Sequence, residues 1–162
     1  MNRKALLTAL FALLIFTGCG YKIVLTGKDA AFKIYPSSIE NLSDDLEATS
    51  LFSDEIRLYL ATINGLGTRE KADYTGEFTL VKLNSSGSSS SSSTTTEYAR
   101  LSITINIKDQ KGNEVYSKTI NSFENYDNTA NQSETRSNRE YAIKEAISKA
   151  MTDFRNAFEQ RK

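Results

Sequence analysis

The stretch YARLSITINIK, residues 98–108, decides the fold. It alternates strictly between apolar and polar side chains. The apolar positions are Ala99, Leu101, Ile103, Ile105 and Ile107, and the polar positions are Arg100, Ser102, Thr104, Asn106 and Lys108. Because successive side chains of a β-strand point to opposite faces, the stretch predicts a strand with one buried and one polar face. Such a strand is typical of an antiparallel sheet that is covered on one side only.

Other strands flank this one. Residues 109–112 supply turn residues and residues 115–121 return as a strand, which together predict a hairpin. Residues 72–83 form the strand before it. Its apolar side chains on one side are Tyr74, Phe78 and Leu80. An earlier strand, residues 31–35, is expected to end at Pro36, the only proline, because proline has no backbone N–H group.

Two segments have helical spacing. The first begins near Ser43, or about a turn later with Ser50 or Ser53 as its cap, and is stopped by Gly65 and Gly67. Its apolar face consists of Phe52, Ile56, Tyr59, Leu60 and Ile63. The second begins at Ser137, whose spacing from Glu140 is that of a capping box. Its apolar stripe, which we expect to lie in the core, consists of Ile143, Ile147, Ala150, Met151, Phe154 and Phe158.

These elements predict a single α+β domain over residues 31–162, in the order β-α-β-β-β-α. Two amphipathic helices need a shared apolar surface, and the covered side of the sheet offers one. We therefore expect a four-stranded, mostly antiparallel sheet with both helices packed on one face. The Ser/Thr-rich tract at 84–96 has nothing to bury and is expected to be a flexible loop, most simply a tolerated insertion. A glycosylated stalk or a partner-binding loop is the alternative.

The chain opens like a secretory leader. Basic residues Arg3 and Lys4 precede an apolar block at 5–16, which is shorter than the roughly 20 residues that span a bilayer. The only cysteine, Cys19, follows at the end of the sequence Phe16-Thr17-Gly18. An exported protein with one cysteine has no internal disulfide to form, so the thiol needs another explanation.

The residues around Cys19 resemble the lipobox of bacterial lipoproteins. The resemblance implies that residues 1–18 are a signal peptide, that Cys19 carries a diacylglycerol and an N-acyl chain, and that residues 19–30 form a lipidated segment. Several acyl chains anchor a protein durably, whereas one chain binds only reversibly. Gly20 follows the cysteine where inner-membrane retention commonly uses Asp, so the expected location is the periplasmic side of the outer membrane. An ordinary secreted protein with a free thiol is the alternative.

Composition disfavours several functions. Basic and acidic residues balance at 20 each, so bulk attraction to nucleic acid is not expected. The chain has no histidine, which excludes a Ser-His-Asp triad and a His-containing metal site. The adjacent carboxylates Asp44/Asp45 and Asp54/Glu55 are more typical of solvated helix surfaces than of acid/base pairs. We expect no enzymatic activity, no metal and no cofactor other than the covalent lipid.

The order of several landmarks resembles the LPS-assembly lipoprotein (LptE) family. They are Cys19-Gly20-Tyr21, the segment FKIYPSSIEN at 32–41, EYARL at 97–101, the turn at 109–112, FENY at 123–126 and NREYAI at 138–143. The resemblance spans most of the chain after Cys19. It implies a non-enzymatic protein that plugs the outer-membrane β-barrel LptD, helps that barrel assemble, and contacts lipopolysaccharide (LPS) on its way to the cell surface.

LPS carries phosphates, so cations on the exposed side of the sheet are its candidate contacts. Arg100 and Lys108 share the polar face of the clearest strand, and Lys118 lies on the neighbouring strand. These three residues are the predicted LPS contacts.

Two other classes of function stay open. One is an outer-membrane lipoprotein that regulates another envelope complex, as a peptidoglycan-synthase activator or as a secretion or efflux component. An activator that crosses the periplasm usually needs a long tether, whereas only residues 20–30 separate Cys19 from the first strand. The other is a periplasmic carrier of a small apolar ligand, which would need a cavity between sheet and helices.

Overall fold

The computed structural model describes residues 29–91 and 94–161. Its elements are β1 (Ile34–Asn41), α2 (Ala48–Thr62), β2 (Tyr74–Ser91), β3 (Thr94–Asp109), β4 (Glu114–Asn128) and α3 (Gln132–Glu159). The predicted α+β order is therefore confirmed. The predicted signal peptide and Cys19 lie outside the described residues.

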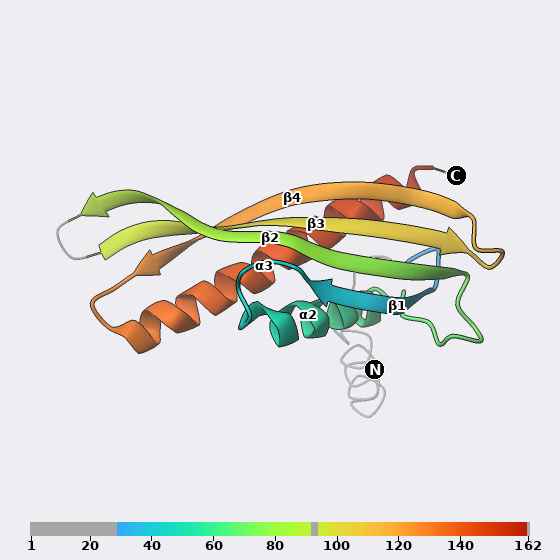
Figure 1. Ribbon diagram of the computed structural model, residues 1–162, viewed down its shortest axis with the longest axis horizontal. Helices are drawn as coiled ribbons and strands as arrows, with labels where there is room; N and C mark the ends of the chain where they lie inside the picture. Colours follow the sequence, from blue (N-terminus) through green and yellow to red (C-terminus); the bar gives the residue numbers. More distant parts are fainter. Residues whose placement is uncertain (1–28, 92–93, 162) are drawn as a thin grey trace, which may run out of the picture.

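The four strands form one sheet in the order β1-β2-β3-β4. The β2–β3 and β3–β4 pairs are antiparallel, whereas β1 runs parallel to β2. A parallel neighbour needs a crossover connection, which α2 provides. Both helices lie on the same side of the sheet, as predicted (Figure 1). We call this covered side the inner face and the opposite side the outer face.

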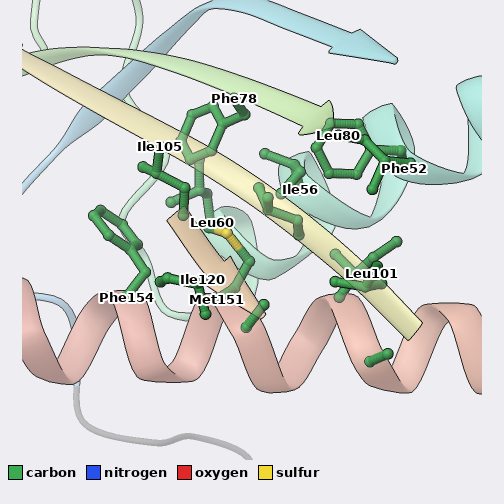
Figure 2. Close-up of a cluster of buried hydrophobic side chains, with 14 of the residues drawn as sticks. Phe52, Ile56, Leu60, Phe78, Leu80, Leu101, Ile105, Ile120, Met151 and Phe154 are labelled. Atoms are coloured by element: carbon green, nitrogen blue, oxygen red, sulfur yellow. The ribbon is translucent and has the colours of Figure 1, made fainter. Parts of the chain in front are cut away.

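The core lies between the inner face and the two helices. All five apolar positions of the stretch at 98–108 are buried, and so are all six residues of the predicted stripe on α3. Figure 2 shows side chains from β2, β3 and β4 pointing toward others from α2 and α3. Phe52, Phe78 and Phe154 are among the largest fully buried side chains. The period-2 and period-3.6 patterns therefore identified the core correctly.

Helix α3 begins elsewhere than predicted. Helix α3 begins at Gln132 because Asn131 caps it, accepting N–H bonds from Ser133 and Glu134. The predicted capping box at Ser137 is therefore wrong. Helix α2 begins at Ala48, about a turn after Ser43 and before the alternative caps Ser50 and Ser53.

The segment between β1 and α2 is a turn held by its own side chains. The Asn41 side chain accepts the Ser43 N–H at 2.9 Å and donates to the Asp45 carbonyl at 2.7 Å. The Asp45 carboxylate accepts the Ala48 N–H at 3.2 Å. Short polar side chains compete with the helix for backbone groups, which delays its start.

Strand β1 does not end at Pro36, as predicted, but continues to Asn41. The pairing with β2 shifts register between Pro36 and Ser38. Since β1 is an edge strand with a β-bulge at this point, a residue without an N–H group is tolerated there.

The predicted loop at 84–96 is wrong for most of its length. Strand β2 extends to Ser91 and β3 begins at Thr94, with Ser91 paired to Thr94. Strand β4 likewise extends to Asn128, and Thr95 pairs with it. Strand pairing uses backbone N–H and C=O groups that serine and threonine carry like any other residue. Because β4 holds β3 extended on its other side, the tract continues the ladder without a core of its own.

Candidate functional site

The outer face is the part of the sheet that no helix covers, and its middle is polar. Three rows of cross-strand side chains hydrogen-bond there between β3 and β4. Their polar atoms lie 2.6 Å apart for Ser102 and Asn121, 2.9 Å for Thr104 and Thr119, and 2.7 Å for Asn106 and Ser117. These rows make an uncharged surface of hydroxyl and amide groups.

One end of the outer face carries a cation between two aromatic rings. The Arg100 guanidinium carbon lies 5.3 Å from the centre of the Tyr98 ring and 5.8 Å from that of the Phe123 ring. The two rings meet edge to face, with centroids 6.2 Å apart. We call these three residues the outer-face cluster. Cation–π contacts of this kind hold the planar guanidinium in place while its N–H donors stay available.

The sheet positions this cluster directly. Arg100 is opposite Phe123 in the β3–β4 register, and Tyr98 lies two residues before Arg100 on the same face. Phe123 remains 58% exposed, so the cluster is a surface feature. Within the described part of the chain, no acidic side chain pairs with Arg100.

A shallow depression lies beside the cluster. Its lining residues are Lys82, Asn84, Arg100, Leu101, Ser102, Asn121, Ser122 and Phe123. Two of these are cations and none is an acid. The depression can therefore accept an anionic group, with hydroxyl and amide side chains at its rim.

Lys108 shares the outer face with Arg100 but is far from it and already paired. Its ammonium group lies 2.6 Å from the Glu77 carboxylate. Eight residues separate Lys108 from Arg100 along β3, which corresponds to about 26 Å. The two cations are on one face, as predicted, but they do not form one site.

Lys118 is on the other face. It lies opposite the buried Ile105 in the β3–β4 register, and paired residues of antiparallel strands point to the same side of the sheet. The expectation that Lys118 joins the polar face is therefore wrong. Its side chain stays exposed because β4 is the edge of the sheet.

Beyond Ala99, the inner face carries polar groups beside the apolar core. The Tyr126 hydroxyl and the Asn128 side chain both donate hydrogen bonds to the Glu97 carboxylate. The bond from Tyr126, then that from Asn128, holds the pKa of Glu97 below its ordinary value. Burial raises the pKa of Tyr126. These hydrogen bonds connect the edge strand β4 to its neighbour β3, so we assign them a role in the stability of the sheet.

An ion pair connects three elements nearby. Arg139 of α3 pairs with Asp45 of the turn before α2 and donates to the Ser85 hydroxyl of β2 at 3.1 Å. Both charged side chains are largely buried, at 24% and 17% exposed. Arg139 therefore links both helical regions to the sheet.

Sequence reasoning found Arg100 but missed its surroundings. Tyr98 is two positions before Arg100, a spacing that places it on the same face, so the alternation itself carried this signal. The positions of Lys82 and Phe123 beside Arg100 follow only from the strand register. The register of Lys82 depends on the β-bulge between Leu80 and Lys82, and that of Phe123 depends on how far β4 extends along β3.

Two structural findings concern chemistry and membranes. Within residues 29–91 and 94–161, no group of three or more His, Cys, Asp or Glu side chains is placed to hold a metal ion. No helix in those same ranges is long and apolar enough to cross a membrane.

The arrangement defines a class of fold: a mixed four-stranded sheet with two helices on one face. No family model and no curated protein matches this chain. Solved structures do. A protein of Caulobacter crescentus CB15 assigned as a lipoprotein is 14% identical with a TM-score of 0.54, over 74% of this chain and 86% of that one.

Two further structures share the fold. Protein XCC0632 of Xanthomonas campestris is 11% identical with a TM-score of 0.52, over 83% of this chain and 91% of that one. The hypothetical protein CT253 of Chlamydia trachomatis is 8% identical with a TM-score of 0.52, over 82% and 98%. At these identities the likeness establishes a common fold, and one of the proteins with that fold is assigned as a lipoprotein.

Proposed function

We propose that this chain is a non-catalytic lipoprotein of the bacterial outer membrane, anchored on the periplasmic side by acyl chains on Cys19. The motif at 16–19 supports the anchor, and the fold shared with the Caulobacter protein supports the class. Ala30, the second described residue, already bonds to the domain, donating its N–H to Ile63 at 2.7 Å. The tether of about 11 residues spans at most about 40 Å, which keeps the domain near the membrane.

Within that class, the proposed role is to plug the LPS-translocating barrel LptD, to help it assemble, and to contact LPS. The observation that carries this role is the uncovered, polar outer face. A barrel lumen is lined by polar groups and water, and hydroxyl and amide side chains can exchange hydrogen bonds with both. The choice of LptD and LPS comes from the family resemblance of the landmarks between Cys19 and residue 143.

Of the three predicted LPS contacts, we retain only Arg100, which belongs to the outer-face cluster. Arg100 has no acidic partner among the described residues, and Lys82 lines the same depression. Lys108 is engaged by Glu77, and Lys118 is on the inner face. Arg100 with Lys82 is therefore the pair through which an LPS phosphate would bind.

The partner is tested by purifying the tagged, lipidated protein from detergent-solubilised membranes. We expect a large β-barrel protein to co-purify, and the folded amount of that barrel to fall when this protein is depleted. Co-purification of a peptidoglycan synthase or an efflux component without a barrel would overturn the proposal in favour of a regulatory role.

The LPS contact is tested with the purified domain and LPS. Arg100→Glu should weaken binding about tenfold or more, because a hydrogen bond between charged groups contributes roughly 1.5–3 kcal/mol. Lys118→Glu is the matched control, since it makes the same change in charge on the inner face. Equal affinities of Arg100→Glu and the unmodified domain would exclude the cluster as the contact.

A further inference from the structure

Exposed apolar side chains flank the two cations of the outer-face depression. Leu42 is 67% exposed, Val81 is 46% exposed and Phe123 is 58% exposed. They are three of the seven large apolar side chains that are exposed in the described residues. Lys82 and Arg100 are on β2 and β3, between the end of β1 and Phe123 on β4. We call these five residues the amphipathic patch.

A β-bulge brings Val81 to the outer face. Leu80 and Leu83 belong to the core and are only 0% and 7% exposed, so both point inward. Regular alternation places one outward side chain between two inward ones, whereas the bulge between Leu80 and Lys82 adds a residue and leaves two. Val81 therefore lies on the outer face together with Lys82.

Leu42 lies beside Val81, just beyond the end of β1. Its N–H donates to the Leu80 carbonyl at 2.9 Å. In a parallel pair this bond continues the register of β1 with β2 by one residue, so Leu42 is opposite Val81. The preceding Asn41 side chain points toward α2, where its amide donates to the Thr49 hydroxyl at 3.0 Å. Since side chains alternate, Leu42 points to the outer face.

The two cations are close enough to hold one phosphate. Lys82 is opposite Ser102, which is two residues after Arg100 on β3. Such diagonal neighbours are about 7–8 Å apart, within reach of long side chains. Within the described residues neither cation forms an ion pair, and no acid lines the depression. A phosphate is therefore the complementary group.

We propose that the amphipathic patch binds one anionic acyl lipid, with a phosphate on Arg100 and Lys82 and an acyl chain along Val81 and Leu42. A ligand that carries only charge would leave the apolar side chains in water, and a ligand of hydrocarbon alone would leave the cations unpaired. The lipid is LPS, so this inference rests on the proposed function. It adds a contact with the acyl part of LPS, which the cations do not recognise.

Charge disfavours two other occupants of the patch. In a twofold contact between two copies the same patch meets itself, which would bring the cations of both copies together, and like charges repel at such distances. The chain's own segment at 20–28 contains Lys22 and Lys28 and no acidic residue, so it would not neutralise Lys82 or Arg100. An anionic lipid meets both requirements of the patch.

The acyl contact is tested by comparing intact LPS with deacylated LPS, which keeps the sugars and phosphates. The lipidated protein is used, with every ligand in the same detergent. We expect the unmodified protein to bind intact LPS about tenfold more tightly. Leu42→Gln should weaken intact LPS about fivefold and leave deacylated LPS unchanged, because it removes only apolar contact. Leu58→Gln, at a leucine 58% exposed on α2, is the matched control.

Arg100→Glu separates this inference from the proposed function, because it should weaken both forms of LPS. If it does so while Leu42→Gln behaves like Leu58→Gln, the acyl contact is overturned and the phosphate contact stands. If Arg100→Glu changes neither affinity, both are overturned. Equal affinities of the unmodified protein for intact and deacylated LPS would also overturn the acyl contact. Phosphatidylglycerol that binds as tightly as LPS would overturn the assignment of the lipid.

A photoreactive residue at position 42 identifies the occupant in intact envelopes. We expect an adduct with LPS, and none from the same group at position 58. An adduct with another protein, with a second copy, or with residues 20–28 of the same chain would each overturn the proposal in favour of that occupant. Labelling at position 42 no stronger than at position 58 would also overturn it, because the patch would then be empty.

Discussion

The two faces of the sheet differ although the same strands build them. On the inner face, Phe154 meets the rings of Phe32, Phe78 and Tyr116 at centroid distances of 5.3–6.4 Å. On the outer face, Thr104 and its neighbours form neutral polar rows that end at Arg100. The difference teaches that alternation along β3 separates the groups that hold the domain together from those free to contact a partner. Substitutions should therefore affect either stability or binding.

The largest expected effect is on the inner face. Phe154→Ala should lower the free energy of unfolding by about 3–5 kcal/mol, because it removes a fully buried ring and leaves a cavity. Urea denaturation of the domain without its lipid measures this change. A loss below about 1 kcal/mol would mean that the helices do not pack as described.

A smaller effect is expected where the inner face is polar. Arg139→Ala should cost about 1–3 kcal/mol, because it leaves the largely buried Asp45 without its partner. Arg136→Ala is the control, since Arg136 pairs with Glu47 and Glu140 on an exposed surface. Equal losses in the two variants would contradict the linking role of Arg139.

Acid should lower the free energy of unfolding through the Glu97 carboxylate, which lies at the polar end of the inner face. The bonds from Tyr126 and Asn128 lower the pKa of Glu97 in the folded protein, so their stabilisation is complete above the ordinary value of 4.5 and is lost as pH falls through the lowered pKa. Tyr126→Phe removes the largest cause. The difference in unfolding free energy between about pH 6 and about pH 3 should therefore be smaller in this variant than in the unmodified domain. An identical pH dependence would show that the carboxylate is not held in this way.

The smallest effect on stability is expected on the outer face. Phe123→Ala should change the free energy of unfolding by less than about 1 kcal/mol, because the ring is 58% exposed and loses mainly its contact with Arg100. The same variant should weaken LPS binding if the cluster is the contact. A decrease in the free energy of unfolding as large as that of Phe154→Ala would contradict the proposed difference between the two faces.

Much of this fold could be predicted from the sequence because buried residues recur at the period of the strand or helix that carries them. The alternation at 98–108 and the stripe from Ile143 to Phe158 both identified core residues that the structure confirms. The limits of the elements were harder to predict. The serine tract at 84–96 has no periodicity, and its pairing depends on how far β3 and β4 extend beside it.

The site could be predicted only in part. Arg100 was identified because its face follows from its own strand. Lys118 was misplaced because its face depends on the register between β3 and β4, which one strand does not determine. Lys108 was placed on the correct face, but its neutralisation by Glu77 comes from a third strand.

The central claim is that the outer face is the working surface of a membrane-anchored domain. Cys19 is the only cysteine, so a single new cysteine can be followed by its reaction with a maleimide. Thr119→Cys and Lys118→Cys place the thiol on neighbouring exposed residues of opposite faces. We predict that both react in the purified protein and that Thr119→Cys is the more strongly protected in intact envelopes. Equal labelling of Thr119→Cys in envelopes and in the purified protein would contradict the account.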